Sequence, residues 1–192
     1  MLIKSLNRFG MSFYRHFSAK KFFLEVYGCQ MNTNDAEIVS GILSSCSEPM
    51  YEKCNDISEA DIVLLMTCAI RENAETKIWN RLNYIKSLEN KSRKSLIVGV
   101  LGCMAERLKS ELLERNKTVD LVCGPDSYRD LPKLLKSTAL DRDSNINVSL
   151  SADETYADIA PVRLDASRKT AFVSIMRGCN NMCAFCIVPF VR

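Results

Sequence analysis

Short apolar runs that alternate with amphipathic segments constrain the fold of this chain more than any other feature. The runs are FFLEVY at residues 22–27, DIVLLM at 61–66, LIVGVL at 96–101 and DLV at 120–122, with a weaker candidate at 50–52. The first three have the length of a buried strand, the fourth is a short one, and a helical apolar stripe follows each of the four. Repeated strand–helix units with continuous apolar strands predict an α/β fold, in which helices cover both faces of a parallel sheet.

Helix signals and changes of composition set the expected boundaries. Thr33 or Asn34 can cap a helix after the first strand, and a helix of about 20 residues is expected to follow Cys68. The apolar stripe of this second helix consists of Ile70, Ala74, Ile78, Leu82, Ile85 and Leu88. We expect the sheet domain to span residues 22–140, a polar linker to span 141–169, and a second domain to begin at 170–192. Its first strand is predicted at Thr170–Met176 (TAFVSIM).

Three cysteines follow the ends of predicted strands. Cys29, Cys68 and Cys103 each come just after an apolar run, and Gly28 and Gly102 precede two of them. Parallel strands end at the same edge of a sheet, where ligands of open α/β sheets bind. The pattern predicts either a shared site or ordinary buried thiols, and it leaves both readings open. Cys123 also follows a strand, so the pattern does not select which three cysteines would bind. Cys46 and Cys54 are assigned to core or surface.

A second group of cysteines lies near the end of the sequence, in RGCNNMCAFCIVPF. The C-x3-C-x2-C spacing of Cys179, Cys183 and Cys186 suits a 4Fe–4S cluster in which three thiolates bind three irons and the fourth iron stays open. A zinc site is the first alternative, but His16 is the only histidine that could complete it. A redox C-x-x-C is the second alternative, and it leaves the third cysteine without a role.

Charge and composition narrow the class of protein. Nine cysteines without a secretory signal argue against a disulfide framework and for metal ligation. Residues 1–21 contain five basic residues and no acid, which is typical of a mitochondrial targeting segment, with cytoplasmic location as the alternative. Removing these five from the 26 basic residues leaves 21 against 23 acidic residues. The remainder therefore lacks the basic surface of a nucleic-acid-binding domain. No apolar run is long enough to span a membrane.

Five sequence blocks together resemble one enzyme family. YGCQMN around Cys29, TCAIRENAE around Cys68 and LGCMAER around Cys103 are similar to the three signature blocks of the methylthiotransferase N-terminal domain. GCNNMCAFCIVPFVR resembles the family's radical S-adenosylmethionine (radical-SAM) loop, and TYADIAPVR at 155–163 resembles the segment that joins the two in the tRNA branch. The motifs are most like the MiaB type, including its mitochondrial branch.

The resemblance implies two iron–sulfur clusters and a reaction. Cys29, Cys68 and Cys103 would bind an auxiliary 4Fe–4S cluster, and this implication favours Cys103 over Cys123. Cys179, Cys183 and Cys186 would bind the 4Fe–4S cluster that cleaves S-adenosyl-L-methionine (AdoMet). The enzyme would add a methylthio group to C2 of N6-isopentenyladenosine, next to the anticodon of a tRNA. The C–H bond is too inert for acid–base chemistry, so the cofactors supply that step with an electron donor.

The resemblance also implies what these 192 residues lack. Family members continue with most of a (β/α) barrel and an RNA-binding TRAM domain, so we expect this chain alone to be inactive. Sister branches act on threonylcarbamoyladenosine or on a ribosomal protein, and the loop and TYADI favour the isopentenyladenosine branch. The alternatives are a non-catalytic interaction module that binds a kinase regulator and a zinc-binding structural protein.

Overall fold

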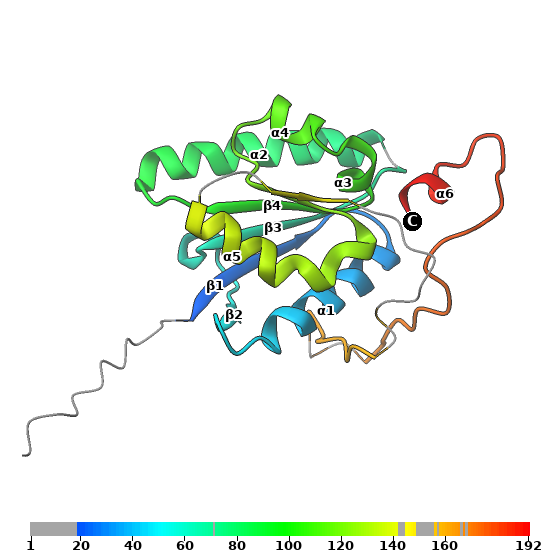
Figure 1. Ribbon diagram of the computed structural model, residues 1–192, viewed down its shortest axis with the longest axis horizontal. Helices are drawn as coiled ribbons and strands as arrows, with labels where there is room; N and C mark the ends of the chain where they lie inside the picture. Colours follow the sequence, from blue (N-terminus) through cyan, green and yellow to red (C-terminus); the bar gives the residue numbers. More distant parts are fainter. Residues whose placement is uncertain are drawn as a thin grey trace, which may run out of the picture.

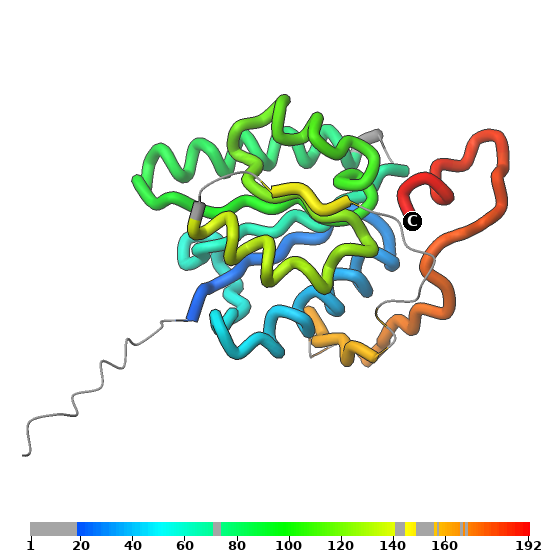
Figure 2. Tube along the Cα trace, in the orientation of Figure 1, coloured from blue at the N-terminus to red at the C-terminus, as the bar shows by residue number. Residues whose placement is uncertain are grey.

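A computed structural model of the chain describes residues 19–70, 72–141, 145–148, 156, 158–165, 167 and 169–192 (Figure 1). Almost all of the expected targeting segment therefore lies outside the described residues, as do Arg71 and much of the expected linker at 141–169. The described residues form one α/β layer structure, from which the C-terminal segment extends as a long loop (Figures 1 and 2).

A parallel sheet forms the centre of the described part of the chain. Its strands are β1 (Lys20–Val26), β2 (Tyr51–Lys53), β3 (Ile62–Thr67), β4 (Ile97–Gly102), β5 (Leu121–Cys123) and β6 (Asn145–Asn147). They lie in the order β2-β1-β3-β4-β5-β6, and every neighbouring pair is parallel. The predicted parallel α/β sheet is confirmed.

The strand register aligns the ends of the three central strands. Val26 of β1 pairs with Met66 of β3, and Thr67 of β3 pairs with Gly102 of β4. Because all the strands point the same way, the loops that follow β1, β3 and β4 leave the sheet side by side. We call this part of the molecule the carboxyl edge.

Helices cover both faces of the sheet, as Figures 1 and 2 show. One face carries α1 (Gln30–Ser44) and α5 (Leu131–Asp141), and the other carries α2 (Glu72–Ser92), α3 (Cys103–Leu108) and α4 (Glu111–Arg115). Short 3-10 turns η1 (Ile57–Glu59) and η2 (Pro125–Asp130) and the terminal helix α6 (Val188–Val191) complete the elements. Each face has its own buried apolar cluster, with Leu64 on the α1 side and Leu65 on the α2 side. Adjacent residues of β3 point to opposite faces, which is why the strand is apolar throughout.

Several sequence expectations need correction. Helix α1 begins at Gln30, and its N-cap is Cys29 rather than the expected Thr33 or Asn34. The side-chain oxygen of Asn32 accepts the backbone N–H of Cys29 at 3.4 Å, and this contact starts the helix sooner. Ile70, expected on the buried stripe of α2, precedes that helix and is 57% exposed.

Two further observations concern local structure inside the stretches expected to be a linker and the start of a second domain, and the domain boundaries themselves stay a prediction. The edge strand β6 lies inside the stretch expected to be a linker, where it pairs with β5. The strand predicted at Thr170–Met176 does not form: the described residues from 169 to 187 contain no strand. A strand needs a hydrogen-bonding neighbour, and Val173 and Ile175 of this segment are 82% and 90% exposed.

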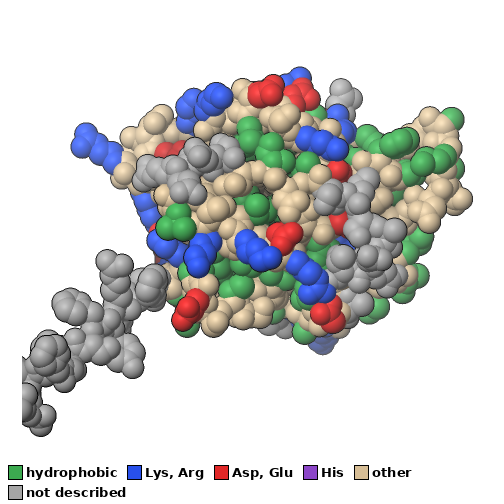
Figure 3. All heavy atoms as spheres, viewed as in Figure 1, with side chains coloured by type: hydrophobic (Ala, Val, Ile, Leu, Met, Phe, Trp, Pro, Cys, Tyr) green, Lys and Arg blue, Asp and Glu red, His purple; other side chains and the backbone are tan. Residues whose placement is uncertain are grey.

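The surface carries charges of both signs. On the face drawn in Figure 3, several lysine and arginine side chains lie in a row across the middle, with acidic side chains above and below them. None of the helices among the described residues is long and apolar enough to cross a membrane.

Candidate functional site

Three cysteines stand at the ends of three adjacent strands. Cys29 follows β1 and caps α1, Cys68 comes directly after β3, and Cys103 directly follows β4 as the first residue of α3. Because β1, β3 and β4 are neighbours in the sheet, the three residues lie in consecutive positions along the carboxyl edge. We call Cys29, Cys68 and Cys103 the edge cysteines.

Two glycines allow the backbone to approach closely between the edge cysteines. Gly28 and Gly102 have φ angles of 152° and 91°, a region that side chains disfavour. A Cβ atom on Gly28 would lie 2.9 Å from the Cβ of Cys68, and one on Gly102 would lie 2.6 Å from the carbonyl oxygen of Thr67. A side chain at either position would therefore clash with the end of β3 or with the loop that follows it.

Asn32 ties the loops of the carboxyl edge together. Its side chain is fully buried, and Nδ2 donates to the carbonyl oxygen of Thr67 at 2.6 Å. Its Oδ1 accepts from the thiol of Cys29 at 3.2 Å. The Thr67 hydroxyl in turn donates to the carbonyl oxygen of Leu101 at 2.6 Å. This chain of hydrogen bonds links the ends of β1, β3 and β4 next to the cysteines. In the sequence, only the position of Asn32 within YGCQMN pointed to it.

The edge cysteines differ in depth. Cys68 and Cys103 are 2% and 3% exposed, whereas Cys29 is half-buried and lines a shallow surface pocket with Gln30 and Met31. Burial raises the pKa of the Cys103 thiol, and Arg192 partly offsets this effect because its Nε donates to the Cys103 sulfur at 3.2 Å. The backbone N–H of Ile70 donates to the Cys68 sulfur at 3.4 Å. The site is thus open at Cys29 and closed at Cys103.

The other cysteines of the sheet domain have different surroundings. Cys123 is the last residue of β5, is fully buried in the core on the α1 side, and has a pKa that burial raises. Cys54 packs into the core on the α2 side, and Cys46 is half-buried at the end of α1. The structure thus separates Cys123, which lies within a strand, from the edge cysteines, which lie beyond strand ends.

The C-terminal cysteines lie on an extended loop. Cys183 is exposed, Cys179 and Cys186 are half-buried, and a turn brings the N–H of Cys186 to the carbonyl oxygen of Cys183 at 3.0 Å. We call Cys179, Cys183 and Cys186 the loop cysteines. Nowhere in the described part of the chain do three or more His, Cys, Asp or Glu side chains form a group arranged to hold a metal ion.

The donor set of the carboxyl edge nevertheless suits an iron–sulfur cluster. The three cysteines follow adjacent strand ends, and the two glycines let those strand ends approach one another closely. Iron–sulfur clusters are held by cysteine thiolates, so the edge cysteines supply three ligands of the required type.

A buried ionic group beside the edge cysteines was absent from the sequence predictions. Asp35 of α1 pairs with Arg177 and Arg192, the two arginines on either side of the loop cysteines. Both are distant from Asp35 in the sequence, and no local pattern connects the three residues.

The sequence comparisons agree with this fold and this edge. The family described as "Uncharacterized protein family UPF0004" matches residues 21–124, which is over half of the chain and includes all three edge cysteines. The human "Mitochondrial tRNA methylthiotransferase CDK5RAP1" is 55% identical over 176 residues, which cover 90% of this chain and 29% of the human protein. The "CDK5RAP1-like protein" of Caenorhabditis elegans is 55% identical over 166 residues, which cover 86% of this chain and 29% of that protein.

A bacterial relative extends the match. The "tRNA-2-methylthio-N(6)-dimethylallyladenosine synthase" of Phocaeicola vulgatus is 50% identical over 173 residues, or 90% of this chain and 37% of that protein. The chain therefore belongs to the UPF0004 family, and within it to the methylthiotransferases of the MiaB and CDK5RAP1 type. It spans about a third of the length of these relatives.

Proposed function

We propose that the chain is part of a tRNA methylthiotransferase that modifies C2 of N6-isopentenyladenosine next to the anticodon. The observation that carries the proposal is the row of edge cysteines on three adjacent strand ends, inside the region that the family matches. The names of the human and bacterial relatives support the choice of tRNA and of the isopentenyl (dimethylallyl) nucleoside. Because the chain spans only 29% of the human relative, we expect these residues alone to be inactive.

Two cofactor sites follow from this assignment. The edge cysteines would hold an auxiliary 4Fe–4S cluster, and the loop cysteines would hold a second 4Fe–4S cluster that binds AdoMet. When bound, these groups would supply the transferred sulfur and methyl group and the radical that activates the C–H bond. Residues 170–192 would then belong to the start of a radical-SAM domain, and residues 22–140 would form the sulfur-donor domain.

The chain's own residues prepare the carboxyl edge for this role. Asn32 and Thr67 hold the loops of the edge at fixed separations through hydrogen bonds of 2.6 Å. Burial of Cys68 and Cys103 keeps water from two of the three thiols. The guanidinium of Arg192 donates to the Cys103 sulfur, and such hydrogen bonds favour the thiolate form that binds metal.

The assignment also defines partners and location. A tRNA would be the substrate and an electron donor would be required. The mixed charge of the surface in Figure 3 suggests that other regions of the full enzyme bind the RNA. The basic segment 1–21 and the mitochondrial name of the human relative support a mitochondrial location.

Iron binding tests the cofactor assignment. After anaerobic reconstitution with iron and sulfide, we expect about eight irons per chain and equal acid-labile sulfide. Cys29→Ala, Cys68→Ala or Cys103→Ala should each remove about four of them, because each site needs its three thiolates. Cys123→Ala is the matched control and should keep the full content. Zinc without sulfide, or an equal loss with Cys123→Ala, would contradict the assignment.

Nucleoside analysis tests the substrate. Cells that lack the full-length protein should lose the 2-methylthio form of isopentenyladenosine from their tRNA and keep the 2-methylthio form of threonylcarbamoyladenosine. Persistence of the isopentenyl product would show that another branch of the family is the correct one.

A further inference from the structure

Two arginines on either side of the loop cysteines bind the same carboxylate. Arg177 lies two residues before Cys179, and its Nη2 is 3.5 Å from Oδ1 of Asp35. Arg192 lies six residues after Cys186, and its Nη2 pairs with Oδ2 of Asp35. Each oxygen of the carboxylate therefore faces one end of the loop.

This ionic group is buried. The side chains of Asp35 and Arg192 are 2% and 4% exposed, and that of Arg177 is 17% exposed. The hydroxyl of Tyr128 also donates to Oδ2 of Asp35, at 3.3 Å. A buried carboxylate that lost its cationic partners would be strongly unfavourable, so the arginines are held here far more firmly than on a surface.

The group also touches the carboxyl edge. Arg192 contacts Cys103 through Nε while it pairs with Asp35 through Nη2, so one guanidinium joins the carboxylate to an edge cysteine. Two arginines against one aspartate leave a surplus positive charge beside the thiols.

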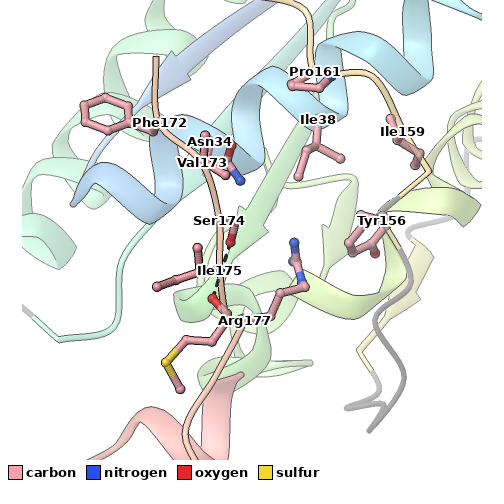
Figure 4. A pocket seen from close by; sticks show the side chains of 11 residues that line it. Asn34, Ile38, Tyr156, Ile159, Pro161, Phe172, Val173, Ser174, Ile175 and Arg177 are labelled. Carbon is pink, nitrogen blue, oxygen red and sulfur yellow. Dashed lines mark hydrogen bonds between the residues drawn. The ribbon is translucent and has the colours of Figure 1, made fainter. Parts of the chain in front are cut away.

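A second contact holds the loop where it enters the domain. The guanidinium of Arg177 lies 4.4 Å from the ring centre of Tyr156, and the hydroxyl of Tyr156 accepts the backbone N–H of Tyr128 at 2.7 Å. Arg177 and Tyr156 line a cavity of about 270 Å³ against Asn34 and Ile38 of α1 (Figure 4). The loop is thus fastened at the residues that flank it.

The middle of the loop, around Cys183, is held much less firmly, whereas Val191 next to Arg192 is buried. Met182, Cys183 and Phe185 are exposed, and Phe185 is 95% exposed. A general packing contact would bury the middle of the loop, whereas a contact that sets its position need only fix its ends.

We propose that Asp35 is a positioning residue that fastens both ends of the cysteine loop to the carboxyl edge and so fixes the loop cysteines relative to the edge cysteines. The significance of this spacing for sulfur transfer rests on the proposed function. The fastening itself involves only the side chains of this chain.

Hydrogen exchange and thiol alkylation of the metal-free, reduced 192-residue chain test the proposal. In Asp35→Asn, a peptide covering residues 183–192, whose backbone N–H groups of Cys186, Phe190 and Arg192 are hydrogen-bonded, should exchange at least about tenfold faster, because the buried pairs with both arginines are lost. Cys103 should be alkylated by iodoacetamide faster by a similar factor, because Arg192 no longer covers it. Peptides from β3 and β4 should exchange as in the wild type, which separates this effect from general unfolding.

Glu25→Gln is the matched control. It breaks the part-buried pair of Glu25 with Arg81, whose Nη2 lies 2.6 Å from Oε1 of Glu25, and neither residue belongs to the loop. This variant should leave the exchange of residues 183–192 unchanged. An Asp35→Asn effect below about twofold, or an equal effect of Glu25→Gln, would overturn the proposal.

A double-mutant comparison tests whether Asp35, Arg177 and Arg192 hold the loop as one unit. Arg177→Gln and Arg192→Gln should each accelerate exchange of the loop, and Asp35→Asn combined with Arg192→Gln should be no faster than Asp35→Asn alone. Additive effects would contradict a single fastening. If Asp35→Asn fails to fold, Arg177→Gln and Arg192→Gln test the proposal instead. Exchange rates of the loop equal to the wild-type rates in both variants would overturn it.

The experiments can contradict the role of Asp35 without contradicting the proposed function, and the reverse also holds. Iron content after reconstitution should be the same for Asp35→Asn as for the wild type, because no ligand changes. Loss of iron binding in the wild type would remove the proposed function and leave the exchange result intact. Normal iron binding with no exchange effect would remove only the fastening.

Discussion

The carboxyl edge and the C-terminal loop each carry three cysteines, but the two groups differ in burial and in the regular structure around them. Cys68 and Cys103 are 2% and 3% exposed and lie at the ends of paired strands, whereas Cys183 is exposed on a segment without regular structure. The sheet organises the first group, because register and hydrogen bonds fix where each strand ends. The loop is organised chiefly at its two ends.

This contrast shows that a shared ligand chemistry does not require a shared degree of order. Cysteines at a sheet edge are held in place because the strands that precede them are part of the rigid core. Thiolates on a short loop depend on its anchoring residues until a ligand binds. Three comparisons between the two regions and one test of α3 beside the edge, taken from the largest expected effect to the smallest, test this difference.

Thiol reactivity should differ most. In the folded, metal-free chain, iodoacetamide should modify Cys183 at least about 100-fold faster than Cys68, because a buried thiol reacts only when the structure opens. Time courses quantified by peptide mass spectrometry give both rates in one sample. In denaturant the two rates should converge, which controls for local sequence. A ratio below about ten in the native chain would mean that the edge is as open as the loop.

Truncation of a large apolar side chain should separate the regions next. Leu101→Ala in β4 should lower the free energy of unfolding by about 3 kcal/mol, because Leu101 is fully buried. Phe185→Ala in the loop should change it by less than about 0.5 kcal/mol, because Phe185 is 95% exposed. Urea unfolding followed by circular dichroism measures both. Similar losses would mean that the loop belongs to the same cooperative core.

The sheet and its edge could be predicted because their signals are local. Apolar runs such as DIVLLM at 61–66 must be buried on both sides, and a parallel sheet then brings their ends together. The edge cysteines were placed correctly at strand ends for this reason. Their function as cluster ligands stays a prediction.

What could not be predicted depends on distant partners. Asp35 and Arg192 are separated by 157 residues, and no periodicity relates them. The run at Thr170–Met176 resembles the other strands in composition, but it pairs with no strand among the described residues and is irregular there. Strand β6 is short and polar, and its pairing with β5 rather than its composition makes it a strand.

Glycine substitutions sharpen the comparison at the level of the backbone. Gly102→Ala should lower the free energy of unfolding by about 2 kcal/mol, since its φ is 91° and a Cβ would lie 2.6 Å from the Thr67 carbonyl. Gly178→Ala, next to Cys179, should lower it by less than about 1 kcal/mol, because its φ is not positive and the added Cβ would meet chiefly the backbone of Arg192, at 2.9 Å. Parallel urea titrations compare the two variants. An equal loss would show that the loop entrance is as constrained as the edge.

The smallest expected effect concerns a carboxylate on α3, the helix that Cys103 begins. Glu106 is 2% exposed and lies 3.5 Å from Lys109, and its Oε2 has no hydrogen-bond partner among the described residues. Burial raises the pKa of this carboxyl. A group whose pKa is higher in the folded than in the unfolded chain contributes stability at low pH and loses it as the pH rises through the folded value.

Glu106→Gln should therefore matter only at the higher pH. A neutral amide of similar size avoids the buried charge, so the variant should be more stable than the wild type by about 1 kcal/mol at pH 8 and nearly equal to it at pH 4. Urea titrations at the two pH values measure the difference. A gain that is the same at both would mean that packing rather than charge is responsible. A lower stability of the variant at pH 8 would mean that the ion pair with Lys109 stabilises Glu106 more than burial of its charge destabilises it. The helix that begins at Cys103 would then depend on an ion pair, as the two ends of the loop depend on Asp35.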